Sequence, residues 1–591
     1  MTIGRLDEPG GPPPAPRGLE EPGGPPVAAG GGEMGRSLPE WVAAPVPAAA
    51  AELVSGGLPG WLAALLARRG IASRAAAEGF LIPSLEHLHD PFLLAGMAEA
   101  VERLLAARQH GELVAVVGDY DVDGVTATAM LLAVFGACRI QARAILPHRL
   151  REGYGFQPVH VEQARALGCS LVVTADCGSS AAAAIAAARA SGIDVVITDH
   201  HLPGPELPAG TVQINPRQDG CPYPFRDLAA AGLALKLAVA LARRCERPLD
   251  LRPLLRIACL GTIADLVPLL GENRVIAALG LRALGEVRSL GLKALIQQAG
   301  VKPPFTAADV GFRLGPRLNA AGRLDAADKA LELLMSRDGQ RAAALAAELD
   351  GWNRERQAEE ARVVEEARQG FAVRSPLPPI LVAWSPGWHQ GVVGIAAGRL
   401  AKELNRPVVL LNVAGDSATG SGRSIPDLEL HTFLAPWRDS MHRFGGHAQA
   451  VGLTIPAGRL ETLAREWEEA GAAWPRDLLA PRHRYELALS PRQVTAELLA
   501  DLARLEPYGQ GNPRPLARIG PLRLSRPPRP FGKGHLAAQA AGDDGATVDL
   551  VGWGWAHRAP SLAGSFEVLA HLEIDSYLHT PVLRLVDLRP A

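Results

Sequence analysis

Acidic and imidazole side chains gather at a few points of this sequence, each directly after a short apolar run. The groups are Asp119, Asp121 and Asp123, then Asp176, then Asp199, His200 and His201, and later Asp265. Carboxylate oxygens with one or two imidazoles favour Mg²⁺ or Mn²⁺, and Mn²⁺ tolerates imidazole better. The six cysteines form no CxxC pair that would indicate zinc. The pattern therefore predicts a site for hard divalent cations.

The number of carboxylates indicates a pair of ions. Two ions roughly 3.5 to 4 Å apart need a bridging carboxylate and several terminal ones, which is more than a single ion needs. In such a pair, water bound to the ions becomes hydroxide near neutral pH and attacks phosphorus. Each Asp alone is also explained as a loop turn or a helix N-cap. Three such groups at successive strand ends favour the metal site.

The surrounding segments predict how these side chains are positioned. Residues 113–117, 171–175 and 194–198 are short, apolar and rich in β-branched residues, as buried parallel strands are. Alanine-rich segments at 126–135, 158–167 and 180–190 are expected to form crossover helices. Because ligands bind at the carboxyl ends of such strands, the acidic groups are expected to converge there.

Length and composition predict a large cytoplasmic protein of several domains. The chain has 591 residues, 48% hydrophobic and 21% charged, with a net charge of -2. This length suggests three or four domains. The near-neutral charge argues only weakly against nucleic acid, because basic residues can be confined to one groove. No apolar run approaches a membrane span, and the cysteine usage fits a reducing cytosol.

The order of sequence patterns predicts an α/β protein in several parts. Residues 1–40 are rich in Pro and Gly and are expected to be a disordered tail. A catalytic domain with a parallel sheet is predicted at 41–335, a long exposed connecting helix at 336–375, and a smaller α/β domain at 376–474. Short alternating segments at 475–591 predict a small β-barrel.

The motifs around the acidic groups are similar to those of a known superfamily. GDYDVDG, TADCG, TDHH and GTIADLVPL resemble successive motifs of the DHH phosphoesterases. RLREGYG, FRLGPRLNAAGRLD, WHQGVVGIAAGRL, GSGRS and GGHAQAVGL resemble the RecJ branch, the single-strand-specific 5′ to 3′ exonucleases. The resemblance covers about residues 45 to 591. It implies a DHH domain, a DHH-associated domain and a C-terminal OB-like domain.

The resemblance implies a role for each acidic residue. One ion would be held by Asp119, Asp121 and Asp176, and the other by Asp123, Asp176, His200 and Asp265, so that Asp176 is the bridge. Asp176, His200 and His201 are the expected catalytic residues, with His201 either a general acid or a partner that orients a carboxylate. Many relatives have a His where this chain has Val117. Asp119 would then substitute for that ligand, and one ion would bind more weakly.

Glycine-rich segments beside basic residues indicate phosphate binding. Residues 420–424 and 445–447 place backbone amides next to Arg423 and His447, although each segment alone is also explained as a turn. The resemblance implies that Ser421, Arg423 and Arg323 hold the terminal 5′ phosphate. Arg149 and Arg151 are candidates for the next phosphates. The other interpretation of these arginines is an ordinary solvated surface.

The C-terminal region carries a local basic segment. Residues 512–535 contain five arginines and one lysine without an acid, and Phe531, Trp553 and Trp555 could stack on bases. Single-stranded nucleic acid binding and a solvated loop with core tryptophans are equally compatible with this pattern. The RecJ-like arrangement favours binding.

The most specific hypothesis is a two-metal, Mn²⁺- or Mg²⁺-dependent exonuclease that releases 5′-mononucleotides from single-stranded DNA. A phosphodiesterase or pyrophosphatase for small substrates and a catalytically defunct binding protein are the alternatives. Length and the basic third domain argue against the first, and the intact carboxylates against the second. The family resemblance implies roles in DNA repair and recombination, with a helicase and a single-strand-binding protein as partners. A monomer is expected, with no membrane partner.

Overall fold

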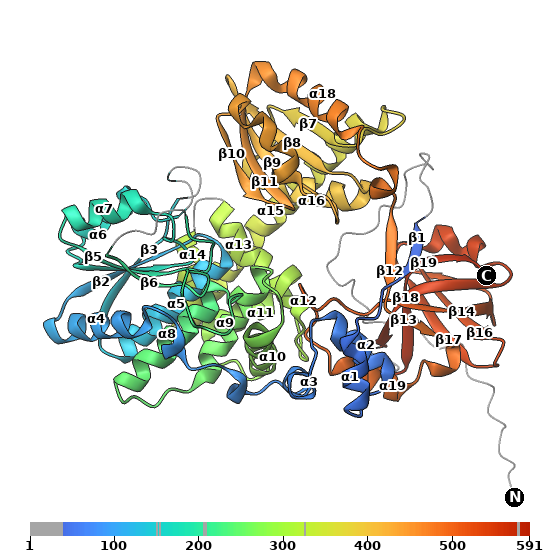
Figure 1. Ribbon diagram of the computed structural model, residues 1–591, viewed down its shortest axis with the longest axis horizontal. Coiled ribbons are helices and arrows are strands. Elements are labelled where there is room, and N and C mark those ends of the chain that lie inside the picture. The colour runs from blue at the N-terminus through green and yellow to red at the C-terminus, as the bar shows by residue number, and fades with distance from the viewer. Residues whose placement is uncertain (1–38, 149–151, 153–154, 205–209, 324–326, 576–578) are drawn as a thin grey trace, which may run out of the picture.

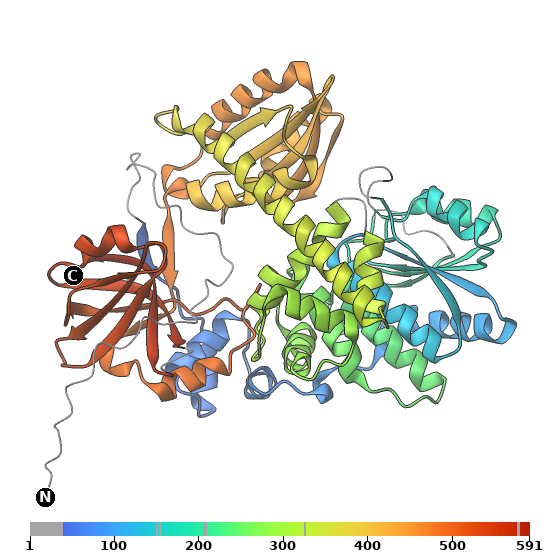
Figure 2. The same ribbon diagram turned by 180° about the vertical axis from the view of Figure 1, so that it is seen from behind.

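The computed structural model describes residues 39–148, 152, 155–204, 210–323, 327–575 and 579–591, and of residue 323 the backbone alone. The predicted disordered tail lies almost entirely outside these residues. Figure 1 shows an α/β domain, a smaller domain above it and a β-rich domain to the right. Helix α15 (Gly339–Ala372) runs from the first domain to the second, and Figure 2 shows its course from behind.

The first domain is built on a parallel sheet in the order β3-β2-β4-β5-β6. Its strands are β2 (Leu113–Gly118), β3 (Gln141–Ile145), β4 (Leu171–Ala175), β5 (Asp194–Thr198) and β6 (Val212–Ile214). The chain goes from β2 to β3 on one side and returns to β4 on the other. The carboxyl ends of β2 and β4 are therefore a topological switch point, where such sheets bind ligands.

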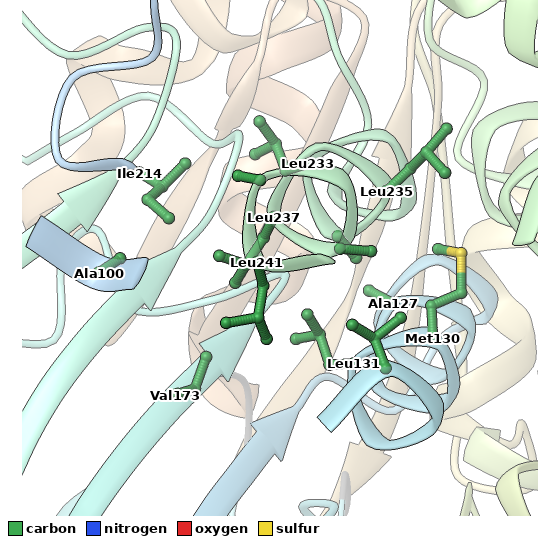
Figure 3. Packing of buried hydrophobic residues seen from close by; sticks show 14 of the residues in the cluster. Ala100, Ala127, Met130, Leu131, Val173, Ile214, Leu233, Leu235, Leu237 and Leu241 are labelled. Atoms are coloured by element: carbon green, nitrogen blue, oxygen red, sulfur yellow. The ribbon is translucent and has the colours of Figure 1, made fainter. Parts of the chain in front are cut away.

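Helices cover both faces of this sheet. Helices α4 (Met97–His110), α5 (Val122–Ala137) and α8 (Ala230–Arg244) share a core with one face, and α6 (Pro158–Ala166) and α7 (Ala182–Ala190) with the other. In Figure 3, Val173 of β4 lies in one cluster with residues of α5 and α8. Fully burying a leucine stabilises the fold by about 1.5 to 3 kcal/mol. The predicted doubly wound arrangement is confirmed.

A helical extension follows the sheet and leads into α15. It consists of α9 (Leu251–Ala264), α10 (Gly271–Leu284), α11 (Leu290–Ala299), α13 (Gly315–Arg323) and α14 (Ala327–Met335). The first half of α15 packs against α11 and α13, and its last turns pack against the smaller domain. Among the described helices none is long and apolar enough to span a membrane.

The smaller domain has a mixed sheet in the order β10-β11-β9-β8-β7. Its strands are β7 (Leu381–Ser385), β8 (Val408–Ala414), β9 (Ser417–Arg423), β10 (Arg443–His447) and β11 (Ala450–Pro456). Helix α16 (Gln390–Leu404) packs over β8 and β9, and α18 (Leu460–Gly471) covers the opposite face. The predicted second α/β unit is therefore present.

The C-terminal domain is a barrel of β14 (Ala517–Leu524), β18 (Phe566–Ile574), β19 (Pro581–Pro590), β17 (Thr547–Gly552) and β16 (His535–Gly542). Pairing of β14 with β16 closes it. Helices α1 (Ala49–Ser55), α2 (Gly60–Arg68) and α3 (Arg74–Leu81) share the barrel's apolar core, and β1 (Glu40–Ala43) pairs with β12 (Arg482–Tyr485). This N-terminal segment, which lies within the predicted catalytic domain at 41–335, packs with the barrel instead.

Candidate metal centre

The first acidic loop connects β2 with α5. Asp121 is the N-cap of α5, and its Oδ1 accepts a hydrogen bond from Gly124 N at 3.0 Å. A side chain at Gly124 would lie 2.6 Å from the backbone nitrogen of Asp119, so only glycine lets the helix start this close to the strand. Asp119 is 2% exposed. The tight turn therefore brings Asp119 and Asp121 to the end of β2.

Asp123 is recessed against the start of another helix. Its carboxylate accepts hydrogen bonds from Ala230 N at 2.7 Å and Ala231 N at 2.9 Å, in the first turn of α8. A helix N-terminus stabilises a negative charge in this way. Gly261 of α9 permits close packing, because a Cβ there would lie 2.6 Å from Asp123 Oδ1.

Asp176 follows β4 in an unusual backbone conformation. Its φ of 68° lies in the left-handed region, which is uncommon for residues other than glycine. The backbone nitrogen donates to Thr198 O at 3.1 Å, which continues the pairing with β5 for one residue. Such strain persists at functional sites when the surrounding structure holds it. Here it places the carboxyl group between the two neighbouring acidic groups.

Asp199 positions the two histidines that come after it. Its carboxylate accepts from the backbone nitrogens of Ser179, His200 and His201 at 2.8 to 3.1 Å, and lies 2.8 Å from His201 Nδ1. Burial opposes ionisation, but these contacts outweigh it and lower the pKa of Asp199 to about 2. The sequence motif identifies Asp199 as one of the clustered acids but does not predict this positioning role, because the fold brings Ser179 and His201 to its carboxylate.

His200 lies at the centre of the cluster. Its Nε2 is 3.1 Å from Asp176 Oδ1, 3.6 Å from Asp265 Oδ2 and 3.8 Å from Asp123 Oδ2. Burial lowers the pKa of His200 to about 3, so the imidazole is neutral, as a metal ligand must be. The ligand atoms of three groups each lie within 4.8 Å of one another. They are Asp119 with Asp121 and Asp176, Asp123 with His200 and Asp265, and Asp176 with both histidines.

The electrostatics of the cluster favour a bound cation. Burial, followed by repulsion from Asp121, raises the pKa of Asp123 to about 7, and the pKa of Asp176 is raised well above its usual range for the same reasons. Burial and repulsion from Asp123 raise the pKa of Asp265 to about 9. Asp176 Oδ1 and His200 Nε2 are buried and lie 3.1 Å apart, but they are not aligned as a hydrogen bond, and neither atom has another hydrogen-bond partner among the described residues. Divalent cations would satisfy both atoms and neutralise the acids, so these residues fit the predicted metals.

Helix α13 supports the acidic loop from outside. Asn319 Oδ1 accepts a hydrogen bond from Val122 N at 3.1 Å. A side chain at Gly322 would lie 2.3 Å from Tyr120 O. The sequence motif around Arg323 contains Asn319, but the contact of Asn319 with Val122 could not be predicted from it. Val117, where many relatives have a histidine, is fully buried in the core between the sheet and helices α6 and α7.

The predicted phosphate-binding residues of the smaller domain lie on one face of its sheet. Arg423 and His447 both pair with Ala450, so they occupy one row across β9, β11 and β10. Ser421 is two residues from Arg423 and faces the same way. A Cβ at Gly394 of α16 would lie 3.1 Å from both Ser421 Oγ and Arg423 Nη2. Arg423 is half-buried and His447 is exposed.

The remaining phosphate candidates are not placed. Arg149 and Arg151 lie outside the described residues, as does the side chain of Arg323, whose backbone ends α13. The described residues record no contact between the acidic cluster and the row of Ser421, Arg423 and His447. The two sets belong to domains joined by α15.

In the barrel, some basic residues of the predicted segment form ion pairs with acids, and others are exposed to solvent. Arg514 and Arg518 form ion pairs with Glu573 at 3.0 Å and Glu567 at 2.6 Å. Four basic side chains are exposed: Arg523, Arg526, Arg529 and Lys533. Beside them the half-buried rings of Phe531 and Trp553 lie 5.8 Å apart. The expectation that Trp555 stacks on bases is wrong, because Trp555 belongs to the barrel core.

The parallel sheet, the acids at its strand ends and the separate smaller α/β domain define a DHH-type phosphoesterase. Family models agree with this class. The DHH family N-terminal domain matches residues 113–262, the DHHA1 domain matches 377–471, and the RecJ OB domain matches 485–586. The chain belongs to the RecJ family.

Curated relatives carry the name single-stranded-DNA-specific exonuclease RecJ. The protein of Dickeya dadantii is 39% identical over 504 residues, covering 79% of this chain and 84% of the relative. That of Escherichia coli is 37% identical, covering 81% and 86%. The Bacillus subtilis relative is 39% identical, and the match covers 77% of this chain but only 58% of that longer protein.

Solved structures agree over a larger part of the chain. The crystal structure of RecJ in complex with Mn²⁺ from Thermus thermophilus has a TM-score of 0.78 at 29% identity, covering 93% of this chain and 80% of that one. The corresponding Mg²⁺ complex has a TM-score of 0.72 at 27% identity, covering 93% and 78%.

Proposed function

We propose that this chain is a metal-dependent exonuclease that removes 5′-mononucleotides one after another from the 5′ end of single-stranded DNA. The observation that carries the proposal is the convergence of Asp123, Asp176, Asp265 and His200 within one buried cluster. The ligand atoms of Asp123, His200 and Asp265 lie within 4.8 Å of one another, and a bound divalent cation would neutralise the acids of this group. Membership of the RecJ family supports the substrate.

Two divalent ions, Mn²⁺ or Mg²⁺, would be held by these residues. Asp119, Asp121 and Asp176 form one ligand group, and Asp123, His200 and Asp265 the other. Asp176 Oδ1 lies 3.1 Å from His200 Nε2, so Asp176 is placed to serve both groups. When bound, such ions lower the pKa of water and stabilise charge that develops on the phosphoryl oxygens. The strained backbone of Asp176 and the α8 amides beside Asp123 hold these ligands before substrate arrives.

His201 is the residue placed to move a proton. Burial opposes its charge, but the hydrogen bond to Asp199 outweighs burial and raises the pKa of His201. His201 Nδ1 lies 2.8 Å from Asp199 Oδ1, and this contact favours the protonated ring, so His201 would act as the proton donor. In the hydrolysis the oxygen of a water molecule would bond to phosphorus, the P–O3′ bond would break, and His201 would donate a proton to the leaving O3′ atom. The proton given up by the water would then restore the protonated form of His201. The products are a 5′-mononucleotide and a strand with a new 5′ phosphate.

The smaller domain would select the strand end. Arg423 offers a planar fork of donors, Ser421 lies beside it, and His447 occupies the same row. Anchoring the terminal 5′ phosphate there sets which linkage reaches the acidic cluster. The exposed basic and aromatic residues of the barrel suit the more distant nucleotides.

Digestion of single strands labelled at either end tests the polarity. With Mn²⁺, the 5′ label should be released first as a mononucleotide, and duplex DNA of the same sequence should resist. Early release of a 3′ label would contradict the polarity. Faster turnover of a dinucleotide than of a long strand would instead favour a phosphodiesterase for small substrates.

The cellular setting is part of the same proposal. A helicase would supply single strands from duplex DNA, and a single-strand-binding protein would cover them, because the site accepts only unpaired ends. The chain would act as a monomer in the cytoplasm, in DNA repair and recombination. Co-purification and size-exclusion chromatography with multi-angle light scattering address these points.

A further inference from the structure

The segment after Asp265 is in contact with the loop that leads into the barrel. Leu269 N donates a hydrogen bond to Gln510 O at 2.7 Å, although the two residues belong to different domains. A side chain at Gly509 would lie 2.6 Å from Leu269 Cδ1, and one at Gly511 would lie 3.0 Å from Pro268 Cβ. The loop at 504–512, named here the barrel loop, therefore fits closely against the segment next to a predicted metal ligand.

Arg274 fastens the barrel loop to the catalytic domain. This residue of α10 is 1% exposed, and its guanidinium donates to the carbonyl oxygens of Arg504, Leu505 and Glu506 at 2.8 to 3.0 Å. It also donates to Phe80 O at 2.6 Å and lies 3.7 Å from the centre of the Phe80 ring. A buried guanidinium is costly unless its donors are satisfied, so these contacts fix the loop relative to α10.

Asn512 keeps the barrel loop in this shape. Its side chain is fully buried and donates to Leu505 O at 2.7 Å and Pro507 O at 2.9 Å. The amide oxygen accepts from Arg69 Nε at 2.6 Å. Because Arg69 belongs to the N-terminal segment, this segment also holds the barrel loop, in addition to Arg274 and Leu269 of the catalytic domain.

The connection between the barrel loop and Asp265 is short. Asp265 ends α9, and the next residue, Leu266, has a φ of 60°, a conformation that side-chain-bearing residues rarely adopt. Leu266 itself is 70% exposed and makes little packing. The residues C-terminal to Leu266 hold its conformation, since Val267 and Leu269 are buried and Pro268 O accepts a hydrogen bond from Asn273.

We propose that the barrel loop positions Asp265, so that the barrel domain is part of the metal site as well as a strand-binding module. This inference rests on the proposed function, because it takes Asp265 as a metal ligand. The loop acts through Leu269 and the strained Leu266, which makes Gly511, Gln510 and Arg274 positioning residues. Displacing the loop should lower the affinity of the site formed by Asp123, His200 and Asp265 for its ion. The affinity of the site formed by Asp119 and Asp121 should not change.

The test is Mn²⁺ binding by the full-length protein, measured by calorimetry and electron paramagnetic resonance. Gly511→Val presses on Pro268, and should weaken one of two Mn²⁺ sites about 10-fold or more, as loss of a supporting contact does elsewhere. Gly545→Val is the matched control. Gly545 also has a positive φ of 77° in the barrel, but no atom lies within 4 Å of its Cβ position. This variant should bind both ions normally.

A double variant separates positioning from general destabilisation. In an Asp265→Asn background the same ion should already be weakened, so adding Gly511→Val should change its affinity little. Additive losses, or equal losses in Gly511→Val and Gly545→Val, would overturn the inference. If Gly511→Val does not fold, Gly509→Ala replaces it, because its Cβ would lie 2.6 Å from Cδ1 of the buried Leu269 and would press on that side chain. This smaller change should weaken the same Mn²⁺ site, by less than Gly511→Val. Wild-type protein that binds two ions but leaves single strands intact would refute the proposed function alone.

Discussion

The parallel sheet of the catalytic domain and the mixed sheet of the smaller domain each present functional residues, but in opposite settings. Asp123 and Asp176 are each 1% exposed, and backbone amides or a strained backbone hold them. Arg423 is half-buried beside α16, and His447 is exposed on β10. The catalytic sheet therefore carries buried acidic side chains, whereas the sheet of the smaller domain carries hydrogen-bond donors that solvent can reach.

This difference indicates that the sheet of the catalytic domain serves the reaction and the sheet of the smaller domain serves substrate binding. Buried acids that repel one another are stable only as protonated groups or as ligands of a cation, so they form a fixed reaction centre. Arg423 and His447 are accessible to solvent, so their hydrogen-bond donors are hydrated until a phosphate binds. Such reversible binding suits a strand that must advance by one nucleotide after each cut. Changes to the first sheet should therefore affect turnover, and changes to the second should affect binding.

The largest effect is expected from Asp176→Asn. The amide keeps the shape but removes the negative charge of a side chain that is grouped with Asp119 and Asp121 and lies 3.1 Å from His200 Nε2, so the rate of hydrolysis should fall by about 10³-fold or more. Single-turnover digestion with saturating Mn²⁺ measures this loss, and strand affinity should stay within a few fold. Asp250→Asn, at an exposed residue paired with Arg252, is the control and should be fully active. Substantial hydrolysis by Asp176→Asn would contradict the assignment of turnover to the sheet of the catalytic domain.

Metal removal should reveal the repulsion within the acidic cluster. The folded-state pKa values of Asp123 and Asp265 are raised from 3.8 to about 7 and about 9. Between these limits the folded protein binds more protons than the unfolded chain. The metal-free free energy of unfolding should therefore fall as pH rises from about 4 through about 7 and 9.

Adding the ion should reverse this trend. Mn²⁺ at about 100 times its dissociation constant adds roughly 2.7 kcal/mol, or about 100-fold in the unfolding equilibrium. The gain should be larger at about pH 8 than at about pH 6, because only deprotonated ligands bind. Thermal unfolding with and without chelator measures both trends. A metal-free protein that becomes more stable as pH rises would contradict the assigned electrostatics.

Arg423→Ala should show the opposite signature to Asp176→Asn. Loss of a charge-assisted hydrogen bond of about 1.5 to 3 kcal/mol should raise KM about 10- to 100-fold for strands with a 5′ phosphate. Strands with a 5′ hydroxyl should be much less affected, and kcat should change little. The control is Arg465→Ala, an exposed residue of α18. Equal losses on both kinds of end would place Arg423 outside end recognition.

The smallest effect is expected in the barrel, from Trp553→Ala. A half-buried ring that stacks on one base contributes about 1 kcal/mol, so strand affinity should fall about fivefold. Trp553→Phe retains an aromatic ring that can stack on a base, so its strand affinity should be close to that of the wild-type protein. Fluorescence anisotropy with strands of increasing length should show a loss only for strands long enough to reach the barrel. A loss on the shortest strands would assign Trp553 to the core.

Local sequence patterns predict the parallel sheet well, because β4 (LVVTA) and β5 (DVVIT) are rich in β-branched residues and are followed directly by Asp176 and Asp199. β3 (QARAI) was missed because it is an edge strand that is partly exposed. The place of α1 to α3 was also missed, since it depends on contacts with residues more than 400 positions away. For the same reason the partners of Arg514 and Arg518 could not be foreseen.

The continuous helix α15 has a consequence for the size of the product. Its 34 residues contain no proline and span about 51 Å. It joins the domain that would grip the end of the strand to the domain that would cut it. A continuous helix would keep the two domains at one separation, so the same linkage next to the anchored end would reach the acidic cluster in every cycle and each product would be a single nucleotide.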